Sequence, residues 1–291
     1  MKNRKQRVFP AALRGKAIWA LAGAFAVAST GCKSPTGNAQ DSTTAANALA
    51  TQTILYELND SVPRKDDKAA YIHFSAKADV DWPTNDNDKA AAAVRSHIAA
   101  TLLNAAQPAS DGEQTVRQAL DTLFSKMRTE ALATGAPGME RYFSYKKVCE
   151  NGTYVSFEEK NYYYDGGANG NEQASGDTYS KADGKRFGFD LLKADAANNK
   201  ALKRLLLDAL QKKFGAANDA ELAKAIGDFV PVNEDQFPLP KQHPYFQKDG
   251  VTFVYQPYEI ASHAAGTPLV VIPFEKMKPF LSDEALNLLG E

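Results

Sequence analysis

The sequence contains few residues that bind metals or act as nucleophiles. Its 291 residues include two cysteines and four histidines, and the histidines are spread along the chain, at His73, His97, His243 and His263. None of the H-E-x-x-H, G-x-S-x-G or paired-cysteine motifs of zinc and serine chemistry occurs. The sequence therefore indicates no catalytic residue, no metal ligand and no cofactor. An enzyme would need groups that only the fold brings together.

Acidic residues outnumber basic ones outside the N-terminus. Six of the 34 Lys and Arg lie in the first 31 residues, where no acidic residue occurs. Without that segment, 34 − 6 = 28 basic residues remain against 35 acidic ones, so the net charge is near −7. An acidic surface without a basic stripe argues against nucleic acid as a partner and favours a cationic protein.

The chain also lacks an apolar run that could cross a bilayer. The apolar run Ala17–Ala28 follows a basic stretch and is typical of an export signal. Small residues followed by Cys32 resemble a bacterial lipobox, which predicts cleavage before Cys32 and its lipidation. The alternative is a plain secretory signal that happens to contain a cysteine. The sequence thus predicts a signal peptide at 1–31, a flexible tether at 32–50 and a lipid anchor in the bacterial cell envelope, on its periplasmic or surface face.

Hydrophobic periodicity predicts a mixture of helices and strands. Helices are expected at 89–106, 111–134, 190–215, 219–226 and, in part, 274–289, and strands at 54–58, 71–74, 141–149, 153–164, 177–180, 185–189, 245–247, 251–255 and 269–272. Alternating polar and apolar residues predict one partly wet face for the strand 153–164. Cys149 lies in the preceding strand, where a buried structural thiol is expected rather than a nucleophile. The predicted fold is α+β: a mostly antiparallel sheet with helices packed on it, in two subdomains.

Two motifs suggest ion binding but fail their tests. The acid-rich run Asp79–Asp88 lacks the glycine and the glutamate that a calcium-binding EF-hand loop requires at its sixth and twelfth positions. We expect a loop that ends in a helix N-cap at Asp86 or Asp88. The glycine cluster 166–170 lacks the Lys-Ser/Thr pair of a phosphate-binding loop and opens no helix, so we expect a loop at the margin of a sheet.

Two groups of residues could bind a partner. The first is the aromatic and amide-rich edge formed by Tyr162, Tyr163, Tyr164, Asp165, Gly166, Gly167 and Asn169, and the second is formed by Tyr258, Glu259 and His263. Exposed tyrosines are good contacts for proteins and sugars. The alternative is structural: alternate tyrosines and Tyr258 would pack against helices, while Glu259 would cap local backbone amides. For Tyr258 and Glu259 the structural role is favoured, and for the glycine loop both remain open.

Three segments in the second half together resemble one known family. They are the aromatic strand that enters 164–169, the helix entry at 189–192, and the stretch 253–261 followed by Gly266 and Ile272-Pro273. The resemblance is to the RsiV-type domain of unknown function, which forms the extracellular part of lysozyme-sensing anti-sigma factors, and it covers residues 139–291. Residues 51–138 are similar to the domain that often precedes it, which is also found at the N-terminus of PdaC-type peptidoglycan deacetylases.

The chain departs from these families in ways that matter for function. Asn169 stands where the family commonly has a histidine, so no role of that imidazole is carried over. A cytoplasmic anti-sigma segment and a deacetylase domain are both missing from this sequence. We therefore expect neither signalling to a sigma factor nor deacetylation from this chain alone.

The leading hypothesis is a non-enzymatic envelope lipoprotein that binds a macromolecular partner. The resemblance implies a lysozyme-like muramidase or another envelope protein, and the acidic charge would attract a cationic lysozyme. The alternative is a glycan- or peptidoglycan-binding module that uses Tyr162–Tyr164. A third reading, an envelope hydrolase, would need a pocket where carboxylates or histidines converge.

Overall fold

The computed structural model describes residues 48–64, 67, 70–86, 88–103, 111–135 and 138–291. The predicted signal peptide, Cys32 and most of the tether lie outside the described residues. By its internal contacts the chain divides into residues 1–30 and 31–291, and all described residues belong to the second unit. Within the described ranges, no helix has both the length and the apolar character that a membrane span requires.

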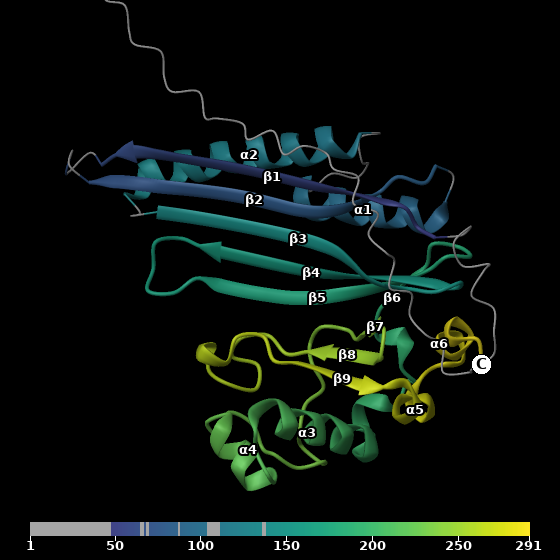
Figure 1. The fold of residues 1–291 in the computed structure, drawn as a ribbon. Coiled ribbons are helices and arrows are strands. Elements are labelled where there is room, and N and C mark those ends of the chain that lie inside the picture. Colours follow the sequence, from purple (N-terminus) through teal and green to yellow (C-terminus); the bar gives the residue numbers. More distant parts are fainter. Residues whose placement is uncertain (1–47, 65–66, 68–69, 87, 104–110, 136–137) are drawn as a thin grey trace, which may run out of the picture. The chain divides into compact units, whose positions relative to one another are not determined.

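Groups of strands are followed by groups of helices along the chain (Figure 1). They are β1 (Thr51–Pro63), β2 (Tyr71–Pro83), α1 (Lys89–Leu103), α2 (Gly112–Thr134), β3 (Gly138–Glu150), β4 (Tyr154–Tyr164), β5 (Asn171–Ser180), β6 (Arg186–Phe187), the 3-10 turns η2 (Phe189–Leu191) and η3 (Ala196–Asn198), α3 (Lys200–Phe214), α4 (Asp219–Ala225), β7 (Tyr245–Gln247), β8 (Gly250–Val254), η4 (His263–Ala265), β9 (Leu269–Pro273), α5 (Phe274–Met277), η5 (Lys278–Phe280) and α6 (Asp283–Leu289). The composition is that of an α+β fold, as predicted.

The strands form two sheets in sequence order. The larger sheet runs β1-β2-β3-β4-β5-β6 and the smaller runs β7-β8-β9. All pairs are antiparallel except β2–β3, which are parallel because α1 and α2 carry the chain back between them. The boundary expected between residues 138 and 139 falls at the start of β3. Strands on both sides of that boundary pair within one sheet.

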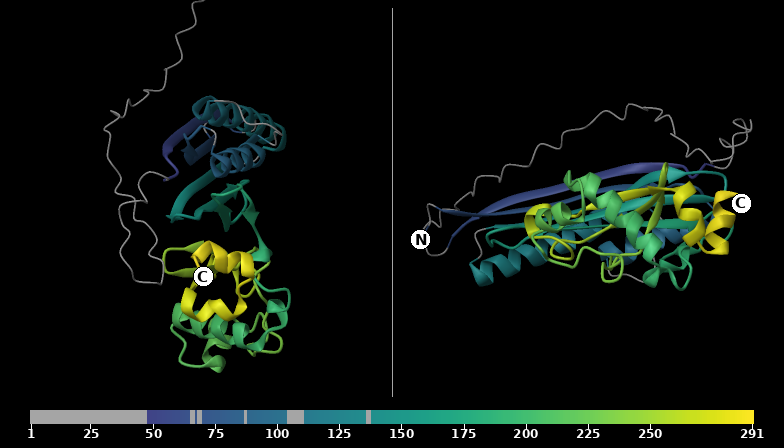
Figure 2. Two further views of the ribbon diagram at one scale, coloured as in Figure 1. Left: turned by 90° about the vertical axis from the view of Figure 1, so that its right-hand side faces the viewer. Right: turned by 90° about the horizontal axis from the view of Figure 1, so that it is seen from below.

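Each face of the six-stranded sheet carries a hydrophobic core. One core lies between the sheet and the α1 and α2 helices and includes Phe74, Ile98 and Phe157. The second core joins Tyr154 and Phe187 of the sheet to the smaller sheet, α3 and the C-terminal helices. The helices therefore cover one face of the larger sheet, and the smaller sheet covers part of the other (Figure 2).

Local capping signals gave reliable element ends. Asp111 accepts hydrogen bonds from the N–H groups of Glu113 and Gln114 at the start of α2, and Gly135 ends that helix at φ +70°. Ser282 caps α6 in the same way, through the N–H of Ala285. The ends of α2 match the predicted ones because a cap involves only neighbours in sequence.

One local prediction needs correction. The first half of the acidic run 79–88 is not a loop: Asp79 and Asp81 extend β2 and pair with Lys146 Nζ at 2.8 and 2.7 Å. The second half behaves as expected, because Asp88 accepts the N–H of Ala91 at 2.9 Å as a helix cap. The face of β4 that begins at Tyr154 is partly wet, as predicted: Tyr154 and Ser156 are buried, whereas Lys160 is exposed. The smaller sheet, which strand alternation alone does not reveal, covers the Tyr154 end of the face.

Candidate functional site

The three predicted tyrosines of β4 divide between the two faces of the sheet. Strand alternation places Tyr163 on the same side as Phe157, toward the α1 and α2 layer, and Tyr162 and Tyr164 on the opposite side. Tyr163 is 38% exposed, and the guanidinium of Arg141 lies 5.8 Å from its ring centre. The three residues therefore do not form one aromatic edge.

The glycine loop connects β4 to β5 as a hairpin, at the sheet margin as predicted. A Cβ at Gly170 would collide with the end of the Tyr162 side chain, so a larger residue there would displace that ring. Gly166 adopts a left-handed φ of +80°. Asp165 accepts a hydrogen bond from Arg141 Nη2 at 2.5 Å, while Gly167 and Asn169 are exposed. The side chain of Asn169 forms no hydrogen bond or ion pair with another described residue.

The Pro257–Gly266 element contains a residue that caps backbone amides, Glu259, and an exposed residue, Tyr258. Glu259 accepts the backbone N–H groups of Gln256 at 2.7 Å and Lys241 at 2.6 Å, which confirms its predicted capping role. Tyr258 contradicts the packing prediction: it is 61% exposed and has a left-handed φ of +65°. Such a conformation is uncommon for a tyrosine and costs backbone energy, so an exposed aromatic held this way is a functional candidate.

The structure brings the glycine loop and the Pro257–Gly266 element together. His263 Nε2 lies 2.8 Å from the carbonyl oxygen of Gly170 and donates to it. The ring of His263 also lies 5.6 Å from that of Tyr258. Further along, Thr267 Oγ1 donates to Glu172 at 3.4 Å. We refer to residues 165–170 and 257–266 as the loop surface.

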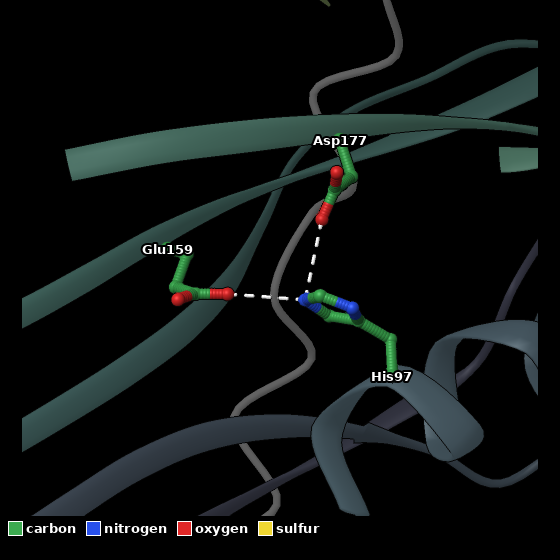
Figure 3. Close-up of side chains that lie close together, drawn as sticks. All are labelled: His97, Glu159 and Asp177. Carbon is green, nitrogen blue, oxygen red and sulfur yellow. Dashed lines mark hydrogen bonds and ion pairs between the residues drawn. The ribbon is translucent and has the colours of Figure 1, made fainter. Parts of the chain in front are cut away.

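A second group of polar residues was not predicted from the sequence. His97 of α1, Glu159 of β4 and Asp177 of β5 converge between the helix layer and the sheet (Figure 3). His97 Nε2 lies 3.0 Å from Glu159 Oε2 and 3.4 Å from Asp177 Oδ2. Arg186 of β6 and His243 also reach Asp177. We call these five residues the His97 cluster.

Asp177 is the centre of the cluster and is only 2% exposed. Its Oδ1 accepts Arg186 Nε at 2.6 Å, and its Oδ2 accepts the hydroxyl of Tyr145 at 2.8 Å. Because the Tyr145 hydrogen points to Asp177, the Tyr179 hydroxyl, 2.8 Å from Tyr145, donates to it in turn. The buried carboxylate thus has a charged donor, Arg186, on one oxygen and a neutral donor, Tyr145, on the other. Buried charges require such hydrogen-bond partners.

Burial and charge set the ionisation of the groups around Asp177. Burial raises the pKa of Tyr145 well above its usual value, and the adjacent Tyr179 and Asp177 raise it further. Burial alone would lower the pKa of Arg186, but the charge and hydrogen bond of Asp177 outweigh it and raise that pKa. Tyr145 is therefore a neutral donor and Arg186 a permanent cation at ordinary pH.

The position of Arg186 determines which nitrogen of His97 carries the proton. Arg186 Nη1 lies 3.2 Å from His97 Nδ1, and a guanidinium can only donate. His97 Nδ1 is then the acceptor, and the proton of the neutral ring is on Nε2, between Glu159 and Asp177. The cluster is consequently a network of hydrogen bonds and ion pairs with defined directions.

The same geometry decides whether the cluster suits a metal. Ligand atoms of His97, Glu159 and Asp177 lie within 4.8 Å of one another, which is close enough for one cation. A metal-bound imidazole, however, donates its other N–H to an acceptor, whereas Nδ1 of His97 faces the donor Arg186. Both oxygens of Asp177 are also occupied. The residues fit an ion-pair network better than a metal centre.

An apolar groove lies near the cluster but does not include it. The groove has a volume of about 850 Å³ and is lined by, among others, Phe189, Leu192, Leu239 and Pro240. Phe189 is 48% exposed, and its ring packs edge-on against His243 at 6.3 Å. None of the five cluster residues lines this groove, so it offers no substrate pocket for their carboxylates and imidazoles.

One part of the chain matches a known protein family. Residues 189–275 match the family model described as a protein of unknown function, DUF3298. A comparison with curated proteins gives no match.

Solved structures of two DUF3298 family proteins share the fold. One, from Bacteroides fragilis NCTC 9343, has 18% identity and a TM-score of 0.65, and the match covers 83% of this chain and 97% of that chain. Another, from Pseudomonas aeruginosa PAO1, has 15% identity and a TM-score of 0.51, with 82% and 98% covered. The shared fold extends well beyond the matched residues and includes strands of the larger sheet. Residues 189–275 of this chain are therefore similar to the DUF3298 domain, whose function is unknown.

Proposed function

We propose that this chain is an exported lipoprotein, anchored at Cys32, that binds a macromolecular partner in the cell envelope without catalysing a reaction. The proposed partner is a lysozyme-like muramidase, as the RsiV-type resemblance implies. Support for export comes from the order of basic, apolar and small residues before Cys32. Radiolabelled palmitate incorporation that depends on Cys32 would identify the anchor, and unchanged labelling of Cys32→Ser would contradict it.

The observation that carries the binding proposal is the exposed, strained Tyr258 on the loop surface. A tyrosine presents a large rigid contact area at low entropy cost. The His263–Gly170 hydrogen bond joins its element to the glycine loop, so both segments would meet a partner together. Asp165 and Glu172 add exposed carboxylates nearby. With a net charge near −7 outside the first 31 residues, the chain would attract a cationic protein.

Calorimetry of residues 33–291 with c-type lysozyme tests this proposal. We expect binding that weakens as salt is raised, and a Tyr258→Ala variant that binds at least about tenfold more weakly because a central aromatic contact is lost. Phe229→Ala is the matched control, since Phe229 is also exposed, at 45%, and lies outside the loop surface. No heat at low salt with micromolar reagents would rule out lysozyme as the partner.

A second candidate is a glycan- or peptidoglycan-binding module. It is favoured by three tyrosines on one face of the larger sheet, because the register pairs Tyr142 with Tyr162 and Tyr164 with Glu140. Aromatic rings beside carboxylates can stack on sugars while hydroxyl groups are hydrogen-bonded.

Pull-down on purified sacculi with single alanine variants tests the glycan candidate. Tyr162→Ala and Tyr164→Ala should each reduce retention several-fold, whereas Tyr163→Ala, on the opposite face, should not. Equal retention of all three variants would exclude this face as the binding site.

A further inference from the structure

The outer edge of β1 is the longest open strand edge in the described part of the chain. The larger sheet ends at β1, which pairs on its inner side with β2 over all 13 residues. The register with β2 has no shift from Thr51–Pro83 to Pro63–Tyr71. An uninterrupted edge of this length offers a row of backbone donors and acceptors to another strand.

Hydrogen bonds at both ends of β1 show which backbone groups point outward. The carbonyl of Ala50 accepts the N–H of Thr84, and the N–H of Arg64 donates to the carbonyl of Ala70, so both residues face β2. In an antiparallel pair, residues facing the partner alternate with residues facing away. Because 50 and 64 are even, the odd residues from Thr51 to Ser61 direct their N–H and C=O groups to the open edge.

β1 has few of the features that usually protect an edge strand, namely two acidic residues, Glu57 and Asp60. It has no bulge and no lysine, and its proline is at its last position, Pro63. Leu55 is 61% exposed, on the face opposite α2. Within the described part of the chain, this leucine offers an apolar contact in the middle of an open edge.

We propose that β1 pairs with β1 of a second copy of this chain, antiparallel about a two-fold axis at Leu55. This register places the two Leu55 side chains against each other and joins the edges through residues 51, 53, 55, 57 and 59, with about ten backbone hydrogen bonds. The two sheets then form one continuous sheet.

The charges of β1 are compatible with this self-pairing. Glu57 and Asp60 are its only charged residues, and both are acidic, so like charges must not lie opposite each other. With the axis at Leu55, Glu57 faces Thr53 of the other copy, and Asp60 lies opposite Ala50. An axis at Glu57 would instead place two carboxylates together. The Leu55 register is therefore self-complementary.

Sedimentation analysis of residues 33–291 tests the proposal. A dimer is expected at micromolar concentration, and Leu55→Lys should weaken it at least about tenfold by placing two ammonium groups at the axis. Glu57→Pro should abolish it without unfolding the chain, because the N–H of Glu57 points outward and is not used by β2. Phe229→Lys is the matched control, since it puts the same charge at an exposed aromatic residue away from β1.

Cross-linking fixes the register. Oxidation of Leu55→Cys should give a covalent dimer, since residues opposite each other in a hydrogen-bonded pair are about 5.5 Å apart at Cα, within disulfide range. Phe229→Cys should not. A monomer at 100 µM, or a dimer that persists in both Leu55→Lys and Glu57→Pro, would overturn the proposal.

Discussion

Replacing Asp177 by alanine is expected to lower the free energy of unfolding by about 3 kcal/mol. The carboxylate is 2% exposed and accepts from Arg186 and Tyr145. Without it, the Tyr145 hydroxyl is buried with no charged acceptor, and Arg186 loses its counter-charge. The side chain of Arg186 is 45% exposed, so its guanidinium can turn toward water. The expected loss of stability therefore lies at the low end of the range for breaking a buried ion pair. Urea unfolding followed by circular dichroism measures it.

Asp165→Ala is the matched control for this prediction. Asp165 also pairs with an arginine, Arg141 at 2.5 Å, but its side chain is 52% exposed. Exposed ion pairs contribute about 0–1 kcal/mol, so this variant should be nearly as stable as the wild type. Asp177→Asn should fall between the two, since the amide oxygen still accepts one donor. If Asp177→Ala and Asp165→Ala lose equal stability, the His97 cluster is not a structural centre.

The sequence contained enough information to predict most elements but not their assembly. The caps at Asp88 and Asp111 depend on residues two or three apart, and such signals are legible in a single sequence. The burial of Tyr154 depends on Phe246, 92 positions later, whose ring lies 5.2 Å away. No pattern within β4 contains that information.

The His97 cluster could not be predicted from the sequence for the same reason: its residues are far apart in the chain. His97 and Glu159 are 62 residues apart, and His97 and Arg186 are 89 apart. His97 lies on α1 next to the buried Ile98, and its side chain is 15% exposed. Which charged residues would face it depends on the order of strands in the sheet, and a parallel β2–β3 pair cannot be read from local spacing. The sequence did indicate the two segments of the loop surface separately, because the residues of each are contiguous, but it did not indicate that the segments meet.

Tyr258 was misjudged for a different physical reason. Tyrosines near prolines usually pack to fix a turn, and composition alone cannot distinguish that from an exposed ring. The left-handed backbone of Tyr258 turns the side chain outward. Such a conformation is set by the contacts of its neighbours, among them the Glu259 caps, and a sequence does not display φ angles.

Gly176→Ala is expected to destabilise the protein by about 2–3 kcal/mol, because it would press the two sheets apart. Gly176 lies on β5 directly beneath the ring of Tyr245, and a Cβ there would be 2.6 Å from three ring carbons. Tyr245 is fully buried, and its hydroxyl donates to Glu158 at 3.0 Å, so the ring has no room to move. On the same face, the Thr178 hydroxyl accepts the N–H of Phe246 at 2.8 Å, which would also be strained.

A double-mutant cycle with Tyr245→Ala isolates this contact. Tyr245→Ala alone should cost about 3–5 kcal/mol by removing a buried ring, but adding Gly176→Ala to it should cost little, because the clash has gone. The coupling energy should therefore be about 2 kcal/mol, which is measurable by urea unfolding of the four proteins. Gly152→Ala, where a new Cβ meets nothing within 4 Å, should change stability by less than about 0.5 kcal/mol. Additive effects of Gly176→Ala and Tyr245→Ala would show that the close approach of β5 and β7 does not set the spacing of the sheets.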